Sequence, residues 1–347
     1  MQNTLLNSLI SIPSVSREET AAADMLQRHL ASLGLEVHRT ADNLWVESEP
    51  RGTKPTLLLD AHIDTVKPVS GWKRNPFIPS YEGGRLYGLG ANDDGGSVVA
   101  LLEVFCRLSA REQPYRLVLS LSAEEEVSGK NGLERVFSEI GPVSLAVVGE
   151  PTGMRMAVAE KGLMVLDCTA EGVSAHAAGS GGVNAIYKAV EAIERLRRLC
   201  FEKESEFLGP VKITVAQIQA GSQHNVVPDL CSFVVDVRSN GLYSNEEILS
   251  LIKESVADLC LVNERSTRLQ SSRADMTLPI VVRGKSMGVQ MYGSPTLSNQ
   301  ALLSCPSVKI GPGDSARSHT ADEYIELKEI ENAVRIYFEL LDGLKID

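Results

Sequence analysis

The sequence has no closely spaced cysteines, no long apolar run and no excess of basic residues. Its six cysteines are scattered along the chain without a Cys-x-x-Cys, which favours reduced thiols in a cytoplasmic protein, so any metal would have to be bound by His, Asp and Glu. No apolar stretch approaches the roughly 20 residues of a membrane-spanning helix, and the N-terminus shows no secretory signal. The net charge of -11 argues against nucleic acids and anionic membranes as partners.

The 347 residues are enough for two domains, and the pattern of apolar residues changes twice along the chain. Up to residue 161, and again from residue 276, strand-like runs alternate with helical runs, which is typical of a mostly parallel sheet flanked by helices. Residues 162–275 instead follow the order strand, helix, two strands, helix, strand. We therefore expect an α/β main domain formed by residues 1–161 and 276–347, and an inserted α+β domain formed by residues 162–275.

Near the N-terminus, Ser16-Arg-Glu-Glu19 is a capping-box pattern, a serine followed three residues later by a glutamate. Apolar residues then recur at helical spacing as far as Leu33, and Gly34 follows as a stop signal. We expect a helix that begins at this capping box and ends before Gly34.

The stretch Leu57-Leu-Leu-Asp-Ala-His-Ile-Asp64 predicts a buried strand that ends in polar side chains. Ligands of open α/β sheets bind at the carboxyl ends of the strands, so His62 is a candidate metal ligand and Asp64 a carboxylate that would orient it. Taken alone, the stretch fits better a strand that enters a solvated loop with an inert His62. The metal interpretation therefore depends on partners elsewhere in the chain.

Acidic residues end the other predicted strands of the main domain. Glu124-Glu-Glu126 follows a strand at residues 116–122, Glu150 follows a strand at 145–148, and Asp93 lies in a glycine-rich turn. These carboxylates would repel one another without a cation, and a carboxylate can bridge two divalent metals. A second histidine, His319, lies in a loop rich in Gly, Pro and Ser before the last helix. A mixed His/carboxylate set suits Zn²⁺, and also Co²⁺ or Mn²⁺.

Taken together, these segments and several in the insert form a set of motifs that extends over nearly the whole chain. They are His62-Ile-Asp64, Gly88-x-Gly-Ala-x-Asp93-Asp, Glu124-Glu-Glu126, Val148-Gly-Glu-Pro-Thr152, Ser174-Ala-His176, Asn225-Val-Val-Pro228, Asp236-Val-Arg238 and His319. In this set the sequence resembles the co-catalytic zinc aminoacylase and carboxypeptidase family, which includes acetylornithine deacetylase, succinyl-diaminopimelate desuccinylase and related dipeptidases.

The resemblance implies a zinc-peptidase-like catalytic domain that binds two Zn²⁺ ions, and an inserted lid or dimerisation domain. Asp93 would bridge the two ions. His62 and Glu150 would complete one metal site, and Glu126 and His319 would complete the other.

The resemblance also implies roles for residues that do not bind metal. Glu125 would be the general base that takes a proton from the attacking water, and Asp64 would orient His62. His176, from the inserted domain and often from the other subunit of a homodimer, would stabilise the oxyanion. Arg238 and Asn225 would hold the substrate's α-carboxylate, although a salt bridge at a strand edge is a competing interpretation of Arg238.

The expected substrate is a small N-acyl amino acid. N2-acetylornithine, converted to ornithine and acetate in arginine biosynthesis, is the first expectation. The alternatives are N-succinyl or N-acetyl derivatives of citrulline, lysine or diaminopimelate, a broader dipeptidase or aminoacylase, and a metal-binding protein without catalysis. The segment Gly293-Ser-Pro-Thr-Leu-Ser-Asn299 departs from the family pattern Gly-Gly-Thr-Ser-Asp, and we expect it to select the substrate.

Overall fold

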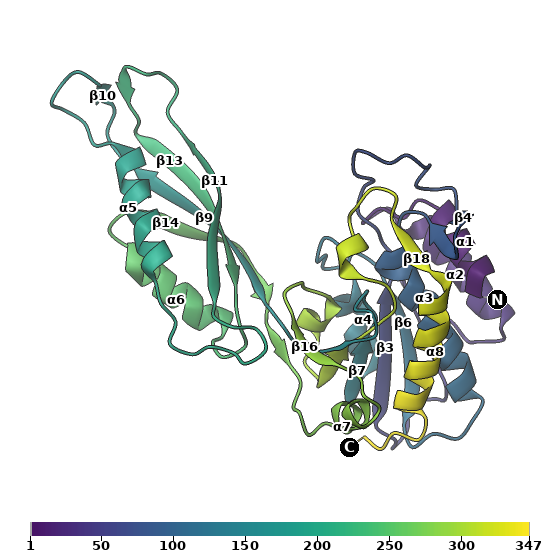
Figure 1. The fold of residues 1–347 in the computed structure, drawn as a ribbon. Coiled ribbons are helices and arrows are strands. Elements are labelled where there is room, and N and C mark those ends of the chain that lie inside the picture. Colours follow the sequence, from purple (N-terminus) through teal and green to yellow (C-terminus); the bar gives the residue numbers. More distant parts are fainter. Residues whose placement is uncertain (1, 347) are drawn as a thin grey trace. The chain divides into compact units, whose positions relative to one another are not determined.

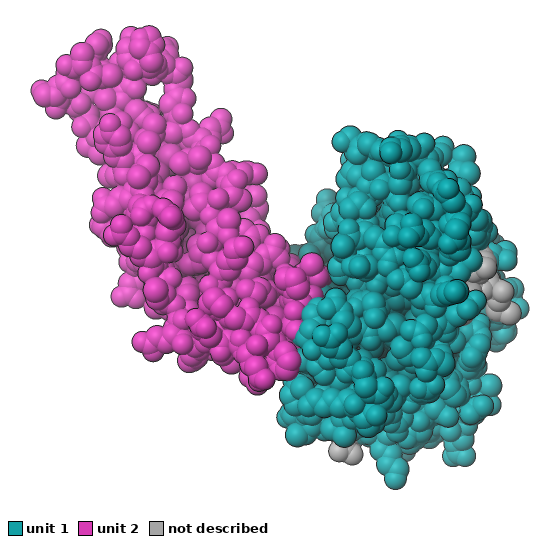
Figure 2. Space-filling view, in the orientation of Figure 1, with its two compact units in different colours: residues 1–158, 274–292, 298–347 teal, residues 159–273, 293–297 magenta. Residues whose placement is uncertain are grey.

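The computed structural model describes residues 2–346, with only the backbone for Gln2 and Asn3. The chain forms two compact units (Figure 2). Unit 1 comprises residues 1–158, 274–292 and 298–347, and unit 2 comprises residues 159–273 and 293–297. Residues 293–297 were expected in the main domain, whereas their contacts group them with unit 2.

The centre of unit 1 is a mixed, largely parallel sheet (Figure 1), of which only β15 and the last two residues of β8 and of β16 are counted in unit 2. The strand order is β1-β2-β6-β3-β7-β17-β8-β15, with β16 paired to β8. The bounds are His38–Thr40 (β1), Asn43–Glu47 (β2), Thr56–His62 (β3), Arg116–Ser122 (β6), Leu145–Val148 (β7), Met156–Glu160 (β8), Ser272–Arg273 (β15), Met291–Ser294 (β16) and Ser307–Lys309 (β17).

Four neighbouring strands of this sheet, β6, β3, β7 and β17, run parallel to one another. Every residue of β3 and β6 is buried, as expected for strands that are covered on both faces. Because the carboxyl ends of parallel strands share one edge, the residues that follow these strands are brought together. The predicted α/β main domain is confirmed.

Helices pack against this sheet. On one face, Leu58, Val118 and Ala146, which are neighbours across β3, β6 and β7, pack against Leu133 and Val136 of α4. The helix α3, in which ten of 14 residues are buried, packs against α8 and also contacts β3 and β6. The helices of unit 1 are Gln2–Ser11 (α1), Thr20–Ser32 (α2), Gly96–Ser109 (α3), Leu133–Ile140 (α4), Pro279–Ser286 (α7) and Leu327–Leu341 (α8).

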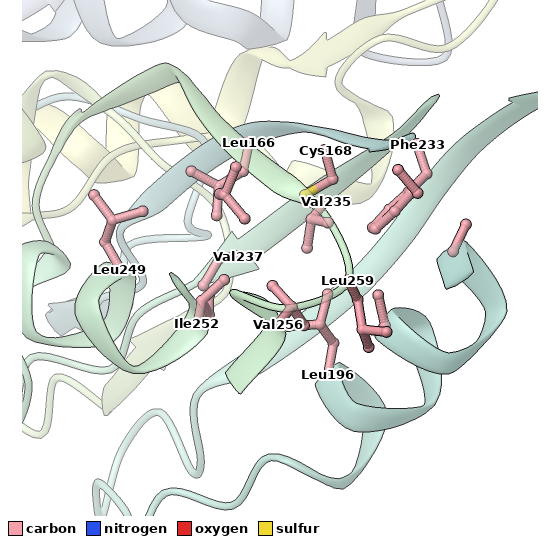
Figure 3. Close-up of a cluster of buried hydrophobic side chains, with 14 of the residues drawn as sticks. Leu166, Cys168, Leu196, Phe233, Val235, Val237, Leu249, Ile252, Val256 and Leu259 are labelled. Atoms are coloured by element: carbon pink, nitrogen blue, oxygen red, sulfur yellow. The ribbon is translucent and has the colours of Figure 1, made fainter. Parts of the chain in front are cut away.

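Unit 2 is built on an antiparallel four-stranded sheet in the order β11-β13-β9-β14. Side chains alternate between buried and more exposed along β9, so that one face of the sheet meets two helices. Figure 3 shows this core, in which Cys168, Phe233 and Val235 of the sheet lie with Leu196 and Ile252 of the helices. The bounds are Leu163–Glu171 (β9), Ala185–Arg198 (α5), Lys212–Ala220 (β11), Leu230–Arg238 (β13), Asn245–Val256 (α6) and Leu261–Leu269 (β14).

The predicted α+β insert is confirmed, because β9, α5, β11, β13, α6 and β14 follow the expected order of strand, helix, two strands, helix and strand. Among residues 2–346, none of the helices is long and apolar enough to cross a membrane.

Candidate metal centre

The ends of the parallel strands of unit 1 bring histidine and acidic side chains together. His62 is the last residue of β3, Glu125 and Glu126 follow β6, and Glu150 follows β7. Two overlapping sets of side chains have ligand atoms within 4.8 Å of one another. One set is His62, Glu125 and Glu150, and the other is His62, Asp93 and Glu126.

The buried imidazole of His62 is oriented through both of its nitrogens. Nδ1 lies 3.0 Å from the main-chain carbonyl of Asp64 and 3.4 Å from the carboxylate of the same residue. Nε2 lies 3.1 Å from Oδ1 of Asp93 and 4.0 Å from Oε2 of Glu125. With a proton on Nδ1 donated to Asp64, Nε2 is the nitrogen that faces the carboxylates.

The carboxylate of Asp64 also holds the turn that carries the two glutamates. It accepts hydrogen bonds from the main-chain nitrogens of Glu125 at 2.9 Å and Glu126 at 3.1 Å, and from the hydroxyl of Ser16 at 2.7 Å. Glu124 supports the same turn from the other side, because its carboxylate accepts from the side chain of Asn131 at 3.0 Å. Asp64 therefore links the histidine to the glutamates, a role that the sequence did not reveal.

The predicted capping box at Ser16 is wrong. Helix α2 begins at Thr20, and its N-cap, Glu19, makes no side-chain capping hydrogen bond. The Ser16 hydroxyl binds Asp64 instead, and Oε1 of Glu19 accepts from the main-chain nitrogens of Arg17 and Glu124. The Ser-x-x-Glu pattern is present in the sequence, but the Ser16 and Glu19 side chains bind Asp64 and Glu124 and do not cap the helix.

Asp93 lies in the turn η1 (Ala91–Gly95), which is held by a residue that the sequence analysis missed. The buried carboxylate of Glu323 accepts hydrogen bonds from the main-chain nitrogens of Gly90 at 3.1 Å, Asn92 at 2.9 Å and Asp93 at 3.0 Å. Burial, together with the negative charge of Asp93, raises the pKa of Glu323 to about 8. In the sequence, Glu323 could be noticed only as an acidic residue close to His319 that had not been assigned as a metal ligand.

Replacing Glu323 with alanine is expected to lower the free energy of unfolding by about 3 kcal/mol, because it leaves buried N–H groups without an acceptor. Metal affinity is expected to fall by about tenfold, because Asp93 loses its support. Urea unfolding and metal titration measure the two effects. Glu331→Ala, at an exposed position of α8, is the matched control and should change neither quantity. Unchanged metal affinity in Glu323→Ala would contradict this role.

The pairing of two strands that are far apart in sequence brings His319 to the same cluster. The strand after its loop, β18 (Tyr324–Glu326), pairs with β5 (Arg85–Tyr87), which immediately precedes the glycine-rich turn. Nε2 of His319 lies 2.8 Å and 3.0 Å from the two carboxylate oxygens of Glu126, and 3.8 Å from Oδ2 of Asp93. His319 is half-exposed, so this side of the cluster is open to solvent.

The electrostatics of the cluster fit divalent cations. Burial raises the pKa of Glu125 and Glu150 well above the ordinary value, and neighbouring carboxylates add to the shift. Burial alone would lower the pKa of His62, but its interactions with Asp64 and Asp93 outweigh this and raise it. Several buried carboxylates around two imidazoles are unfavourable as anions unless a cation is present. The donor set of imidazole nitrogen and carboxylate oxygen is one that Zn²⁺, Co²⁺ and Mn²⁺ accept.

The remaining predicted site residues, His176, Asn225 and Arg238, lie in unit 2. The first two are neighbours, and Arg238 is apart from them. His176 belongs to β10 (Ala175–His176), which pairs with β12 (Val226–Val227), and the main-chain oxygen of Asn225 accepts from Ala177 at 3.0 Å. Nδ1 of the exposed His176 accepts from the main chain of Ala178 at 3.1 Å, which leaves Nε2 free to donate. His176 and Asn225 are therefore neighbours in one short ribbon.

Arg238 is at the opposite end of β13 from this ribbon, because Asn225 precedes Leu230, the first residue of the strand, and Arg238 is its last. Nine residues of β-strand extend over about 26 Å. Arg238 binds both carboxylate oxygens of Asp236, at 2.8 and 3.1 Å, which is the competing salt bridge. Within one copy of unit 2, Arg238 and Asn225 cannot hold the same carboxylate.

Comparison with known proteins adds relatives in both sequence and structure. The family model described as Peptidase family M20/M25/M40 matches residues 58–343. The succinyl-diaminopimelate desuccinylase of Cereibacter sphaeroides is 26% identical over 370 residues, covering 97% of this chain and 97% of that protein. The enzyme of the same name from Thioalkalivibrio sulfidiphilus is 25% identical over 374 residues, covering 99% and 98%.

Solved structures share the fold at lower identity. A tripeptidase from Staphylococcus aureus superposes with a TM-score of 0.79 at 21% identity, covering 98% of this chain and 96% of that one. A Bacillus subtilis protein described as a dinuclear metal binding peptidase has a TM-score of 0.76 at 17% identity, covering 98% and 96%. These relatives are desuccinylases and peptidases, whereas the resemblance was first expected to be to acetylornithine deacetylase.

Proposed function

The chain belongs to peptidase family M20/M25/M40, and from this premise we propose that it is a two-metal amidohydrolase that removes the acyl group from an N-acyl amino acid. The observation that supports this most directly is the arrangement at the strand ends of unit 1. Two overlapping sets of ligand atoms share His62, and a further glutamate, Glu125, stands within one of them.

For the substrate, we place an N-succinyl amino acid, with N-succinyl-diaminopimelate as the first candidate, ahead of N2-acetylornithine. The support is the match over nearly the full chain to two succinyl-diaminopimelate desuccinylases. The likeness to the solved peptidases, at less than 25% identity, supports the fold and does not favour a peptide substrate.

The residues that would hold the two metals are His62, Asp93, Glu126, Glu150 and His319. Bound divalent ions, Zn²⁺ or its substitutes Co²⁺ and Mn²⁺, would lower the pKa of a water molecule and polarise the carbonyl of the scissile amide. The buried carboxylates and the outward-facing Nε2 of His62 suit such ions, as described above.

The other residues would handle protons and charge. Glu125 would take a proton from the attacking water and pass it to the nitrogen of the leaving amine. Asp64 would keep Glu125 in place through its hydrogen bond to the Glu125 main chain, and would keep His62 in one tautomer. Nε2 of His176 would donate a hydrogen bond to the oxyanion that develops on the amide carbonyl.

We further propose that the enzyme works as a homodimer, with His176 and Asn225 acting on a substrate bound at the partner's metal centre. The separation of Asn225 from Arg238 along β13 supports this arrangement. If both residues hold the substrate's α-carboxylate, as the resemblance implies, their separation along β13 is explained when they come from two copies of the chain. Arg238 would then release Asp236 to bind the substrate, exchanging one carboxylate partner for another.

The test is a comparison of kcat/KM for succinyl and acetyl forms of diaminopimelate, ornithine, citrulline and lysine, with dipeptides included. N-succinyl-diaminopimelate is expected to exceed its acetyl analogue by about 10²-fold or more, because a site that pairs the second carboxylate leaves a buried charge unpaired when that carboxylate is missing. Metal-free protein prepared with a chelator is the control for background hydrolysis. A dominant rate on acetylornithine would overturn the succinyl proposal, and a dominant rate on a dipeptide would overturn the deacylase proposal.

A further inference from the structure

The segment Gly293–Asn299 ends in a residue whose side chain is buried. Asn299 is 3% exposed and begins the short 3₁₀ helix η2 (Asn299–Leu302). Its amide nitrogen donates to Oδ2 of Asp60 at 2.8 Å and to the hydroxyl of Ser122 at 2.8 Å. Within the segment expected to select the substrate, Asn299 therefore binds residues of β3 and β6.

The three side chains form a closed set of hydrogen bonds. The Ser122 hydroxyl donates to the same Oδ2 of Asp60 at 3.3 Å, so Asn299 uses both amide hydrogens and Ser122 both donates and accepts. Turning the amide around would place its oxygen against a carboxylate oxygen, which fixes its orientation. Asp60 is fully buried, and its Oδ1 has no hydrogen-bond partner among the residues that the structure describes. Asn299 is thus a main donor to a buried carboxylate that needs donors.

The two partners differ in how firmly they are held. Asp60 lies within β3, paired on both sides with β6 and β7, and its main-chain oxygen accepts from Gly149 at 2.7 Å. The helix η2 is a single turn outside the sheet, and its contacts include those of Asn299 and of the Gln300 side chain, which donates to the main-chain oxygen of Ser307 at 3.0 Å. The segment before it begins in β16, where the main-chain oxygen of Ser294 accepts from Lys161 at 3.1 Å. A strained contact between Asp60 and residue 299 would therefore move η2 and the segment before it, and not the strand that carries His62.

We propose that Asn299 is a positioning residue, and that the Asp60–Asn299 pair anchors residues 293–299 in the conformation that binds substrate. The inference rests on the proposed hydrolase function and adds a residue that acts on substrate affinity without touching the substrate. The pair consists of one carboxylate and one amide, and the exchanged pair, with the amide at position 60 and the carboxylate at position 299, would make the same type of hydrogen bond.

The experiment is therefore a reciprocal exchange. Asn299→Asp places two buried carboxylates in contact, and KM is expected to rise by about tenfold while kcat stays within about threefold. The double variant Asp60→Asn with Asn299→Asp restores one amide and one carboxylate, and KM is expected to return to within about threefold of the parent value. Metal content is expected to stay at the parent level in both variants. Asn332→Asp, the same change at an exposed position of α8, is the matched control.

A readout that does not depend on activity is amide hydrogen exchange of residues 293–302 in the protein without substrate. Exchange is expected to accelerate in Asn299→Asp and to slow again in the double variant. If Asn299→Asp does not fold, Asn299→Ala removes the amide without adding a charge and is expected to accelerate the same exchange and raise KM.

Three results would overturn the inference. One is a double variant whose KM and amide hydrogen exchange both remain at the values of Asn299→Asp. Another is an Asn299→Asp protein whose KM and amide hydrogen exchange both equal those of the parent protein. The third is a fall in kcat with unchanged KM, which would mean that the pair acts on the strand that carries His62. If the parent protein hydrolyses none of the substrates, the proposed function is wrong, but the role of the Asp60–Asn299 pair can still be tested by amide hydrogen exchange. Exchange of residues 293–302 that stays as fast in the double variant as in Asn299→Asp would overturn that role.

Discussion

Replacing Glu125 with glutamine is expected to lower kcat by about 10³-fold while both metal ions remain bound. Glutamine has the shape of glutamate but cannot accept a proton from water. Oε2 of Glu125 lies 4.0 Å from Nε2 of His62, close enough to the cluster to act on a water held there. The main chain of Glu125 stays bonded to Asp64 in the variant, so the turn should keep its geometry.

The measurement is kcat for the preferred acyl amino acid together with metal content per chain. Glu124→Gln is the matched control: it is the preceding residue of the same turn, its side chain bonds Asn131, and its activity should stay near the parent value. Activity that survives Glu125→Gln would show that the proposed mechanism is wrong. Loss of one metal would instead make Glu125 a ligand, as its place in one of the two sets of ligand atoms allows. A protein that only binds metal needs no base here, so a selective loss of turnover would also exclude that alternative.

Replacing His176 with alanine is expected to lower kcat by about 10²- to 10³-fold, the cost of removing one donor to an oxyanion. The side chain of His176 is exposed, and its Nδ1 accepts a hydrogen bond from Ala178, so its removal should leave the free energy of unfolding unchanged. His224→Ala is the matched control, because it is a second exposed histidine close to Asn225 in sequence. Its activity should equal that of the parent protein.

The homodimer proposal is tested by combining the two inactive chains. A dimer of one His176→Ala chain and one Glu125→Gln chain, isolated with two different affinity tags, has one site with an intact Glu125 and an intact His176 from the partner. About half of the parent activity is expected, because one of two sites is complete. Verified mixed dimers without activity would contradict action across the dimer, and a protein that stays monomeric at assay concentration would contradict the dimer itself.

The sequence by itself determined much of the centre, because its signals are local. Leu57-Leu-Leu before His62, the glutamates after Arg116–Ser122 and Glu150 after Leu145–Val148 each join a buried strand to a polar end. Once the strands are parallel, the geometry of the sheet brings those ends together without further information. The alternating pattern of unit 2 predicted its sheet and helices for the same reason, since side-chain direction along a strand or helix follows from period alone.

Tertiary structure alone decided which polar groups meet when they are far apart in sequence. Ser16 binds Asp64 and does not cap the predicted helix. Glu323 accepts hydrogen bonds from the turn that carries Asp93, and Asn299 donates to the buried Asp60. A hydrogen-bonding side chain has several possible partners of similar strength, and the one that it takes depends on which backbone lies beside it. Periodicity carries no information on that choice. The strand ends were therefore readable from the sequence, whereas the contacts that hold the site in place became visible only in the folded chain.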